Sequence, residues 1–105
     1  MTRHDGTDPL SSIDLVIHAP ARLKLITQLY VVEEADATFL SNATGLTWGN
    51  LSTHLRKLEE HRYVKIDKEF QGRKPRTVIS LTERGRAAFQ AYRTTIQTAL
   101  NDLPD

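Results

Sequence analysis

Two groups of side chains in the middle of the chain have the types and spacing that suit contact with a nucleic acid. The first group combines small and hydrogen-bonding residues with two cations: Thr47, Gly49, Asn50, Ser52, Thr53, Arg56 and Lys57. The second group places three cations within four positions: Arg73, Lys74 and Arg76. Hydrogen-bonding side chains can read base edges and clustered cations can neutralise phosphates, so the two groups together predict a contact with double-stranded DNA.

The chemistry of each side chain predicts what it would contact. An arginine donates two hydrogen bonds to guanine and an asparagine pairs with adenine, so we expect Arg56 and Asn50 to read base edges. Ser52 and Thr53 are expected to contact base edges less selectively, and Lys57 to act through its charge. Simpler interpretations are an exposed helix face without a partner, a solubilising turn for the later cations, and for Asn50 a local hydrogen bond at the helix start.

Charge is distributed unevenly, although the net charge is only +1. Residues 1–46 carry three bases and six acids, residues 47–76 carry eight bases and four acids, and residues 77–105 carry three of each. The middle segment therefore has the positive excess expected of a phosphate-binding surface. Solvated charge on a helix and a hairpin would give the same count.

The first half of the chain is predicted to be helical. Apolar residues three or four apart indicate a helix over about 9–18 and a second helix over 20–32, which begins at a proline that needs no hydrogen-bonded N–H there. Residues 33–36 are polar and are expected to form a turn. A short helix is expected from Thr38, although the residues around it also suit a brief strand, and Gly45 supplies the left-handed residue that ends it.

The second half is predicted to contain a helix, a hairpin and a long last helix. Thr47 suits the N-cap of a helix that runs to about residue 61. Alternating apolar and polar residues over 63–70 and 77–81 predict two paired strands, and the basic segment 71–76 is expected to be their turn. The last helix is expected over about 82–103.

Helical geometry sorts the helix after Thr47 into two faces. At about 100° per residue, Leu51, Leu55 and Leu58 fall on one side, and Thr53 and Arg56 fall on the other. Trp48, at the first turn, is expected to pack against these leucines, the alternative being stacking on DNA sugars. Two helices joined by a short glycine-containing turn, followed by a hairpin with a basic tip, predict a winged helix-turn-helix, a mainly α fold with a small β-hairpin (α+β).

The sequence also carries a family resemblance over about residues 20–89. The segments that carry it are Gly49-Asn50-Leu51-Ser52-Thr53-His54-Leu55-Arg56-Lys57-Leu58-Glu59, Tyr63-Val64, Arg76-Thr77 and Leu81-Thr82-Glu83-Arg84-Gly85-Arg86-Ala87-Ala88-Phe89. They resemble the compact winged-helix regulators of the MarR and ArsR groups. The resemblance implies that the helix after Thr47 is the recognition helix, the hairpin is the wing, and the terminal helices form a homodimer. Arg62 stands where the family often has glycine.

Dimerisation is also expected from helix length. A helix over 82–103 would be about 33 Å long at ~1.5 Å per residue and would outrun a compact domain, leaving apolar surface for a partner. The expected interface consists of Leu10, Ile13, Ile17, Ala88, Tyr92, Ile96, Ala99 and Leu103. A two-fold dimer would favour a pseudo-palindromic operator. The alternative is that the first and last helices pack within one chain.

Several functions are disfavoured by what the sequence contains. The chain has no cysteine, and it contains no metal-binding motif, no phosphate-binding loop and no nucleophile elbow. We therefore expect that the protein is not an enzyme and binds no metal and no cofactor. No stretch approaches the roughly 20 apolar residues that span a bilayer, and no signal core is present, so a cytoplasmic protein is expected. Residues 1–8 are expected to be a flexible N-terminus and 9–105 one domain. The remaining alternative function is a winged-helix protein-interaction module, and whether an effector binds is left open.

Overall fold

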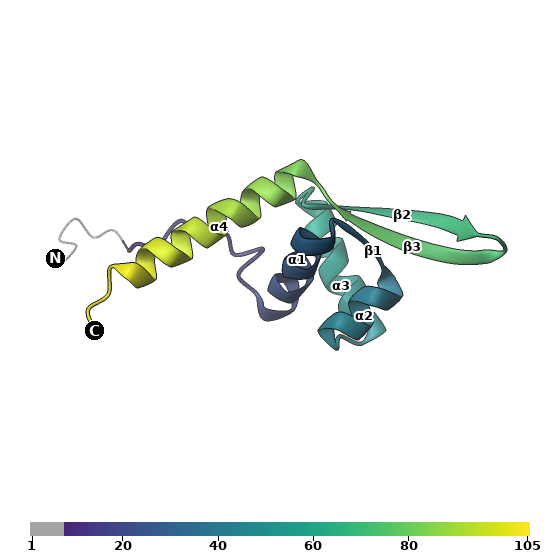
Figure 1. Ribbon diagram of the computed structural model, residues 1–105, viewed down its shortest axis with the longest axis horizontal. Helices are drawn as coiled ribbons and strands as arrows, with labels where there is room; N and C mark the ends of the chain where they lie inside the picture. The colour runs from purple at the N-terminus through teal and green to yellow at the C-terminus, as the bar shows by residue number, and fades with distance from the viewer. Residues whose placement is uncertain (1–7) are drawn as a thin grey trace.

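The computed structural model describes residues 8–105 and has the α+β class expected (Figure 1). The expected flexible segment 1–8 lies, apart from Asp8, outside the described residues. The elements are α1 (Pro20–Val32), β1 (Glu34–Asp36), α2 (Ala37–Thr44), α3 (Trp48–Glu60), β2 (Val64–Gln71), β3 (Lys74–Leu81) and α4 (Glu83–Asn101). The strands form one antiparallel sheet in the order β1-β3-β2. The β2–β3 hairpin and α4 extend from opposite sides of the helical core (Figure 1).

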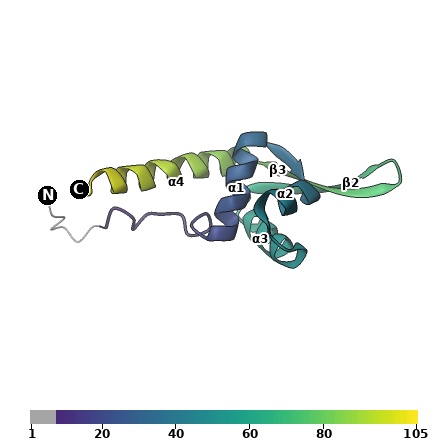
Figure 2. The same ribbon diagram turned by 60° about the horizontal axis from the view of Figure 1, so that its bottom comes forward.

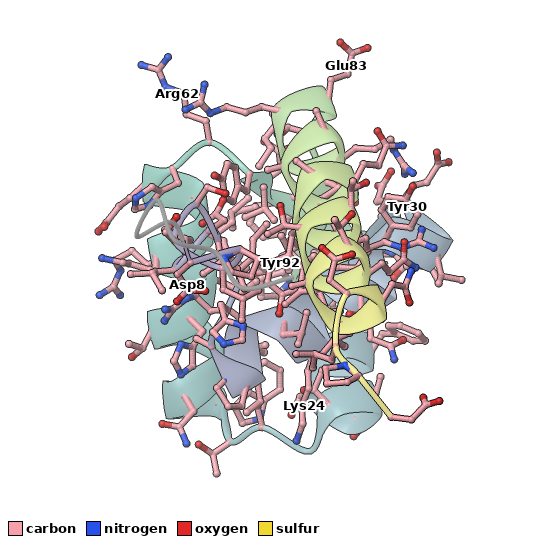
Figure 3. The ribbon with its side chains drawn as sticks, turned by 90° about the vertical axis from the view of Figure 1, so that its left-hand side faces the viewer. Asp8, Lys24, Tyr30, Arg62, Glu83 and Tyr92 are labelled. Carbon is pink, nitrogen blue, oxygen red and sulfur yellow. The ribbon has the colours of Figure 1, made fainter. Side chains whose placement is uncertain are left out.

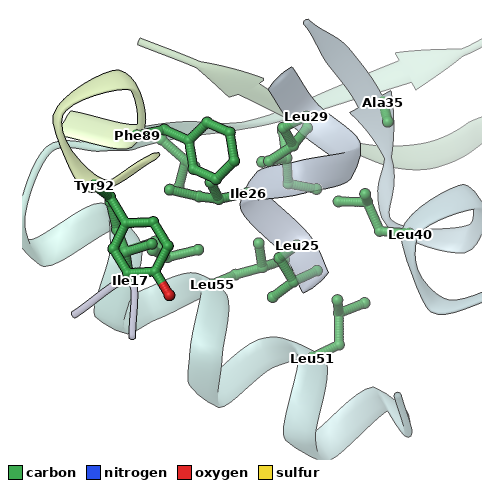
Figure 4. Packing of buried hydrophobic residues seen from close by; sticks show 13 residues of the cluster. Ile17, Leu25, Ile26, Leu29, Ala35, Leu40, Leu51, Leu55, Phe89 and Tyr92 are labelled. Carbon is green, nitrogen blue, oxygen red and sulfur yellow. The ribbon is translucent and has the colours of Figure 1, made fainter. Parts of the chain in front are cut away.

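The hydrophobic core lies between α1, α3, the base of the hairpin and the first half of α4 (Figure 4). Leu51, Leu55 and Leu58 are all buried, which confirms the apolar stripe expected for α3. They pack in one cluster with the buried residues of α1 and of the strands, and Phe89 of α4 belongs to the same cluster. Because α3 packs against the core along this leucine stripe, its opposite, polar face is exposed to solvent.

Short-range signals set most of the helix ends as expected. Pro20 is at the start of α1. Gly45 ends α2 with a φ of 75°, in the left-handed region that glycine adopts without strain. The Thr47 and Thr82 side chains cap α3 and α4 by accepting from the N–H groups of Asn50 and Gly85. The segment that joins α2 to α3 is consequently a tight turn, as in a helix-turn-helix.

The helix expected over residues 9–18 is wrong, because this segment forms two isolated turns. Aspartate side chains take the backbone N–H groups that a helix would use: Asp14 Oδ1 accepts from Val16 N at 2.9 Å and from Ile17 N at 3.4 Å. The segment runs alongside α4 (Figure 2). It is attached there by burial of Ile17 and by the 2.9 Å hydrogen bond between His18 Nδ1 and the Tyr92 hydroxyl.

Three boundaries in the middle of the chain also differ from expectation. Residues 34–36 form β1 instead of a turn, because their backbone pairs with β3 from Glu34 opposite Ser80 to Asp36 opposite Val78. Asp36 then caps α2, which begins at residue 37, one residue earlier than expected. The hairpin turn consists only of residues 72 and 73, since β3 already begins at Lys74.

The junction between α3, the hairpin and α4 is closely packed. Arg62 has a φ of 61°, and it ends α3 by donating to Glu59 O while Tyr63 N donates to Leu58 O, the Schellman arrangement that usually places glycine at this position. The Arg62 side chain points outward, away from the core (Figure 3). Gly85 lies directly against the backbone of Tyr63. These contacts fix where the hairpin leaves the core.

The principal extents of the molecule are 61 × 24 × 21 Å, an elongation that comes from the hairpin on one side and α4 on the other (Figures 1 and 2). Within residues 8–105, no helix has the length and apolar character needed to cross a membrane.

Candidate nucleic-acid interface

The polar face of α3 is fully available to a partner. Asn50, Ser52, Thr53, Arg56 and Lys57 are all exposed. The Asn50 side chain makes no hydrogen bond to another residue in 8–105, so the local role considered for it is not observed. The Thr53 hydroxyl donates to the Gly49 carbonyl at 3.0 Å, which leaves its oxygen and its methyl group for outside contacts.

The first turn of α3 combines a cap with an open backbone. Thr47 Oγ1 accepts a hydrogen bond from Asn50 N at 3.3 Å, so Thr47 is the N-cap of α3. Thr47 is also exposed. Gly49 has no atom within 4 Å of the position that a Cβ would occupy. The backbone at Gly49 is therefore open to close approach by a partner.

The three basic residues expected at the hairpin tip have different environments. Arg73 lies in the turn and Lys74 begins β3, and neither forms an ion pair within the part of the chain that the structure describes. Arg76 lies inside β3, where its guanidinium is 3.5 Å from Asp36 Oδ2 and 3.1 Å from Glu69 Oε1. The expectation that Arg76 belongs to the turn is wrong, and its charge is engaged within the sheet.

A groove of about 440 Å³ separates α3 from the hairpin. Its α3 wall includes Ser52, Arg56 and Glu59, and its hairpin wall consists of Ile66, Lys68 and Thr77; Trp48 stands at its edge, with 59% of its surface exposed. The expectation that Trp48 packs in the core is wrong. It has the phase of the leucine stripe, but at the first residue of the helix no element covers it.

Lys68 is a candidate interface residue that the sequence analysis missed. It lines the groove opposite α3, and it forms no ion pair with any residue in 8–105. Strand alternation was the available signal, because Lys68 falls on the same hairpin face as Val64, which is buried, and Ile66. Lys68 therefore lies on the same face of β2 as these core residues, but further along the strand, where the core no longer covers that face.

A second hollow flanks α3 on its other side. It is lined by Arg22, Thr53, His54, Arg56, Lys57 and Glu60. Arg22 comes from α1, and its Nη1 lies 3.2 Å from His54 Nδ1 while its Nε donates to the Val16 carbonyl at 2.6 Å. A cation from α1 thus extends the basic surface beside α3. Among residues 8–105, no three His, Asp or Glu side chains are grouped as metal ligands.

The base of the hairpin is tied to the N-terminal segment through Tyr63. Its hydroxyl donates to Asp14 Oδ2 at 2.5 Å. Burial, followed by the hydrogen bond and the negative charge of Asp14, raises the pKa of Tyr63 to about 12, with a small opposing effect from Arg84. This contact helps to hold the hairpin in one orientation relative to the core.

Most residues expected at a dimer interface are used inside the chain. Ile17, Tyr92 and Ala99 are buried, with 0%, 8% and 5% of their surface exposed. Ile13, Ala88 and Ile96 pack against the core. The inner face of α4 therefore packs within the chain, which was the alternative to a dimer interface. Of the residues expected at the dimer interface, Leu10 and Leu103 remain exposed.

Comparisons with known proteins agree with this geometry. A family model described as a winged helix DNA-binding domain matches residues 21–100. The chain is 35% identical over 77 residues to an uncharacterised protein of Methanocaldococcus jannaschii, and the matched region covers 73% of this chain and 84% of that protein. A transcriptional regulator homologue from Pyrococcus horikoshii OT3 has a similar structure, with a TM-score of 0.81, 28% identity, and coverage of 90% of this chain and 94% of that one.

A MarR-family regulator from Enterococcus faecalis V583 shares the fold, with a TM-score of 0.71 at 24% identity over 95% of this chain and 93% of that one. The winged-helix fold expected from the sequence is confirmed, and it is similar to the fold of MarR-family regulators. The chain belongs to the family of winged helix DNA-binding domains.

Proposed function

We propose that this protein is a transcriptional regulator that binds double-stranded DNA sequence-specifically, with α3 in the major groove and the β2–β3 wing on the adjacent backbone or in the minor groove. The observation that carries the proposal is the pairing of an exposed polar helix face with a wing whose cations Lys68, Arg73 and Lys74 have no carboxylate partner in residues 8–105. Unpaired cations on both sides of a groove are suited to a phosphodiester strand.

The distribution of charge around the groove supports this orientation. Arg56 on α3 and Lys68 on the hairpin line opposite walls. Glu59 lies near the C-terminal end of α3, where the hairpin begins, so negative charge is confined to the inner end of the groove. Phosphates would therefore be held toward the start of α3 and the wing tip.

Duplex-binding titrations over a range of salt concentrations test the proposal. Each phosphate contact contributes about −0.9 to the slope of log K against log salt, so Arg73→Ala with Lys74→Ala should reduce the slope by about 2. Arg93→Ala is the matched control, because Arg93 is an exposed cation on α4 without an ion pair in the described residues. Equal slopes for all three proteins would exclude the wing from the interface, and no duplex binding at all would favour a protein-interaction module.

We also propose that two copies associate through the exposed apolar residues near the end of α4. Leu100 and Leu103 have 59% and 63% of their surface exposed, and Leu15 in the N-terminal segment has 71%. A second copy covering them would remove apolar surface from water, and a two-fold pair would present two α3 helices to a pseudo-palindromic operator.

Sedimentation at micromolar concentration tests this association. Leu100→Glu with Leu103→Glu should give a folded monomer, because these side chains lie outside the core. Ile96→Glu is a less informative variant, since Ile96 packs against the core. A wild-type protein that sediments as a monomer and binds one half-site would exclude the dimer.

A further inference from the structure

The wing has two faces of different chemistry. Strand alternation and the register of β2 and β3 place Ile66, Lys68 and Phe70 on one face, opposite Ile79, Thr77 and Pro75. The other face carries the acids Asp67 and Glu69, each within an ion pair: Asp67 with Lys65 at 3.5 Å, and Glu69 with Arg76 at 3.1 Å. The negative charges of the hairpin are therefore kept on one face and neutralised there.

The acid-free face is the one that looks onto α3. Ile79 is buried in the core, and Ile66, Lys68 and Thr77 line the groove together with residues of α3. Phe70 and Pro75 continue this face beyond the groove to the tip. Any duplex that contacts α3 and the groove would meet the face that carries Phe70.

Phe70 is an apolar side chain that the fold leaves uncovered. It has 74% of its surface exposed, and it is the seventh residue of a strand of eight residues that is about 26 Å long at ~3.3 Å per residue. The tip lies far from the helical core (Figure 1). Pro75 is its cross-strand neighbour, and Arg73 in the turn and Lys74 next to Pro75 supply two cations without ion pairs in the described residues.

We infer, on the basis of the proposed function, that Phe70 is an apolar wedge that enters the minor groove and partly unstacks one base step. Apolar side chains carried into a minor groove open the step that they contact, and neighbouring cations hold the flanking phosphates. Pyrimidine–purine steps such as TpA open readily and A-tracts resist deformation. Phe70 therefore makes the wing select deformable DNA beside the sequence that α3 reads.

The test compares two duplexes of about 24 base pairs and equal composition at low salt. One alternates T and A and carries 2-aminopurine at a central TpA step; the other consists of two A-tracts. Wild-type protein should raise the 2-aminopurine fluorescence, and Phe70→Ala should abolish that rise and lower the preference for the alternating duplex by about tenfold. Phe70→Leu should retain part of both effects, because leucine can also act as a wedge.

Gln71→Ala is the matched control, since Gln71 is exposed one residue further along β2 on the opposite face. It should behave like wild type. If Phe70→Ala keeps the fluorescence rise and the preference, the wedge is excluded while salt-dependent duplex binding still supports the proposed function. If wild-type protein binds neither duplex, the proposed function fails and the wedge fails with it.

Discussion

Replacement of Gly85 by alanine should unfold the protein at a markedly lower temperature, although alanine is the better helix former. A Cβ at Gly85 would lie 2.1 Å from the Tyr63 carbonyl oxygen and 2.9 Å from Leu81 Cδ1. The methyl group and the carbonyl would have to separate by about 1 Å to reach 3.0 Å, the distance below which Cβ atoms essentially never approach another atom. Because the obstacle is backbone, a rotamer change cannot relieve it.

The magnitude follows from opposing effects. Alanine in place of glycine within a helix gains up to about 1 kcal/mol. Overpacking costs about 1–3 kcal/mol, and here it is at the upper end. The Tyr63 carbonyl also accepts from Thr82 N at 3.1 Å and Thr82 Oγ1 at 3.0 Å, so moving α4 away would lengthen the bonds that join α4 to the hairpin. The net loss is about 2 kcal/mol, or a fall in Tm of about 10 °C.

Gly49→Ala is the matched control for the same chemical change. Gly49 has no atom within 4 Å of the added Cβ position, and it lies in the first turn of α3. The substitution should raise the free energy of unfolding by about 0.5 kcal/mol and Tm by about 2–4 °C. Thermal unfolding followed by circular dichroism measures both variants. A Gly85→Ala protein with the wild-type Tm would refute the close approach of α4 to the hairpin base.

Three further outcomes are expected. Arg62→Gly should raise the free energy of unfolding by about 0.5–1 kcal/mol in a denaturant titration. The substitution removes left-handed strain of about 1–2 kcal/mol at a φ of 61°, and the added entropy of the unfolded state offsets part of that gain. Arg62→Ala should bring no gain, because alanine keeps the strain. Tyr63 has a folded pKa raised to about 12 from an ordinary 10.0, so its contribution to stability is present below pH 10 and is lost as the pH rises toward 12; in an alkaline absorbance titration Tyr63→Phe should remove the latest-ionising tyrosine, and loss of a tyrosine that ionises near pH 10 instead would contradict the Asp14 contact. Arg56→Ala should cost roughly 1–3 kcal/mol on a selected operator and little on a mismatched one, and equal losses on both would remove Arg56 from the base-reading set.

Local physical chemistry explains why so many boundaries could be predicted. The caps at Thr47 and Thr82 and the left-handed glycine at Gly45 act within a few residues, so the start of α3, the start of α4 and the end of α2 could be read directly. Leu51, Leu55 and Leu58 share one side of α3 through helical geometry alone. The exposure of Asn50, Thr53 and Arg56 on the other side follows from the same periodicity.

The features that differed depend on partners far away in the chain. Residues 34–36 form a strand only because β3, more than 40 residues later, supplies the pairing edge. Arg76 was expected in the turn of the hairpin, but it lies within β3, where the sheet brings Asp36 and Glu69 to it. Ile17 and Tyr92 were expected at a dimer interface, but the N-terminal segment folds back along α4 and buries them in the chain.

The candidate site divides in the same way. Which residues can hydrogen-bond to a base or neutralise a phosphate is a property of residue type, and the sequence alone determined it for Asn50, Arg56 and Arg73. Tertiary structure decided which cations remain without an ion pair among the described residues, as Lys68 does on the hairpin face that looks onto α3. It also decided which aromatic side chains remain exposed, namely Phe70 on that same face and Trp48 at the edge of the groove. The reason is that burial and ion pairing depend on distances through space, which periodicity along one element does not specify.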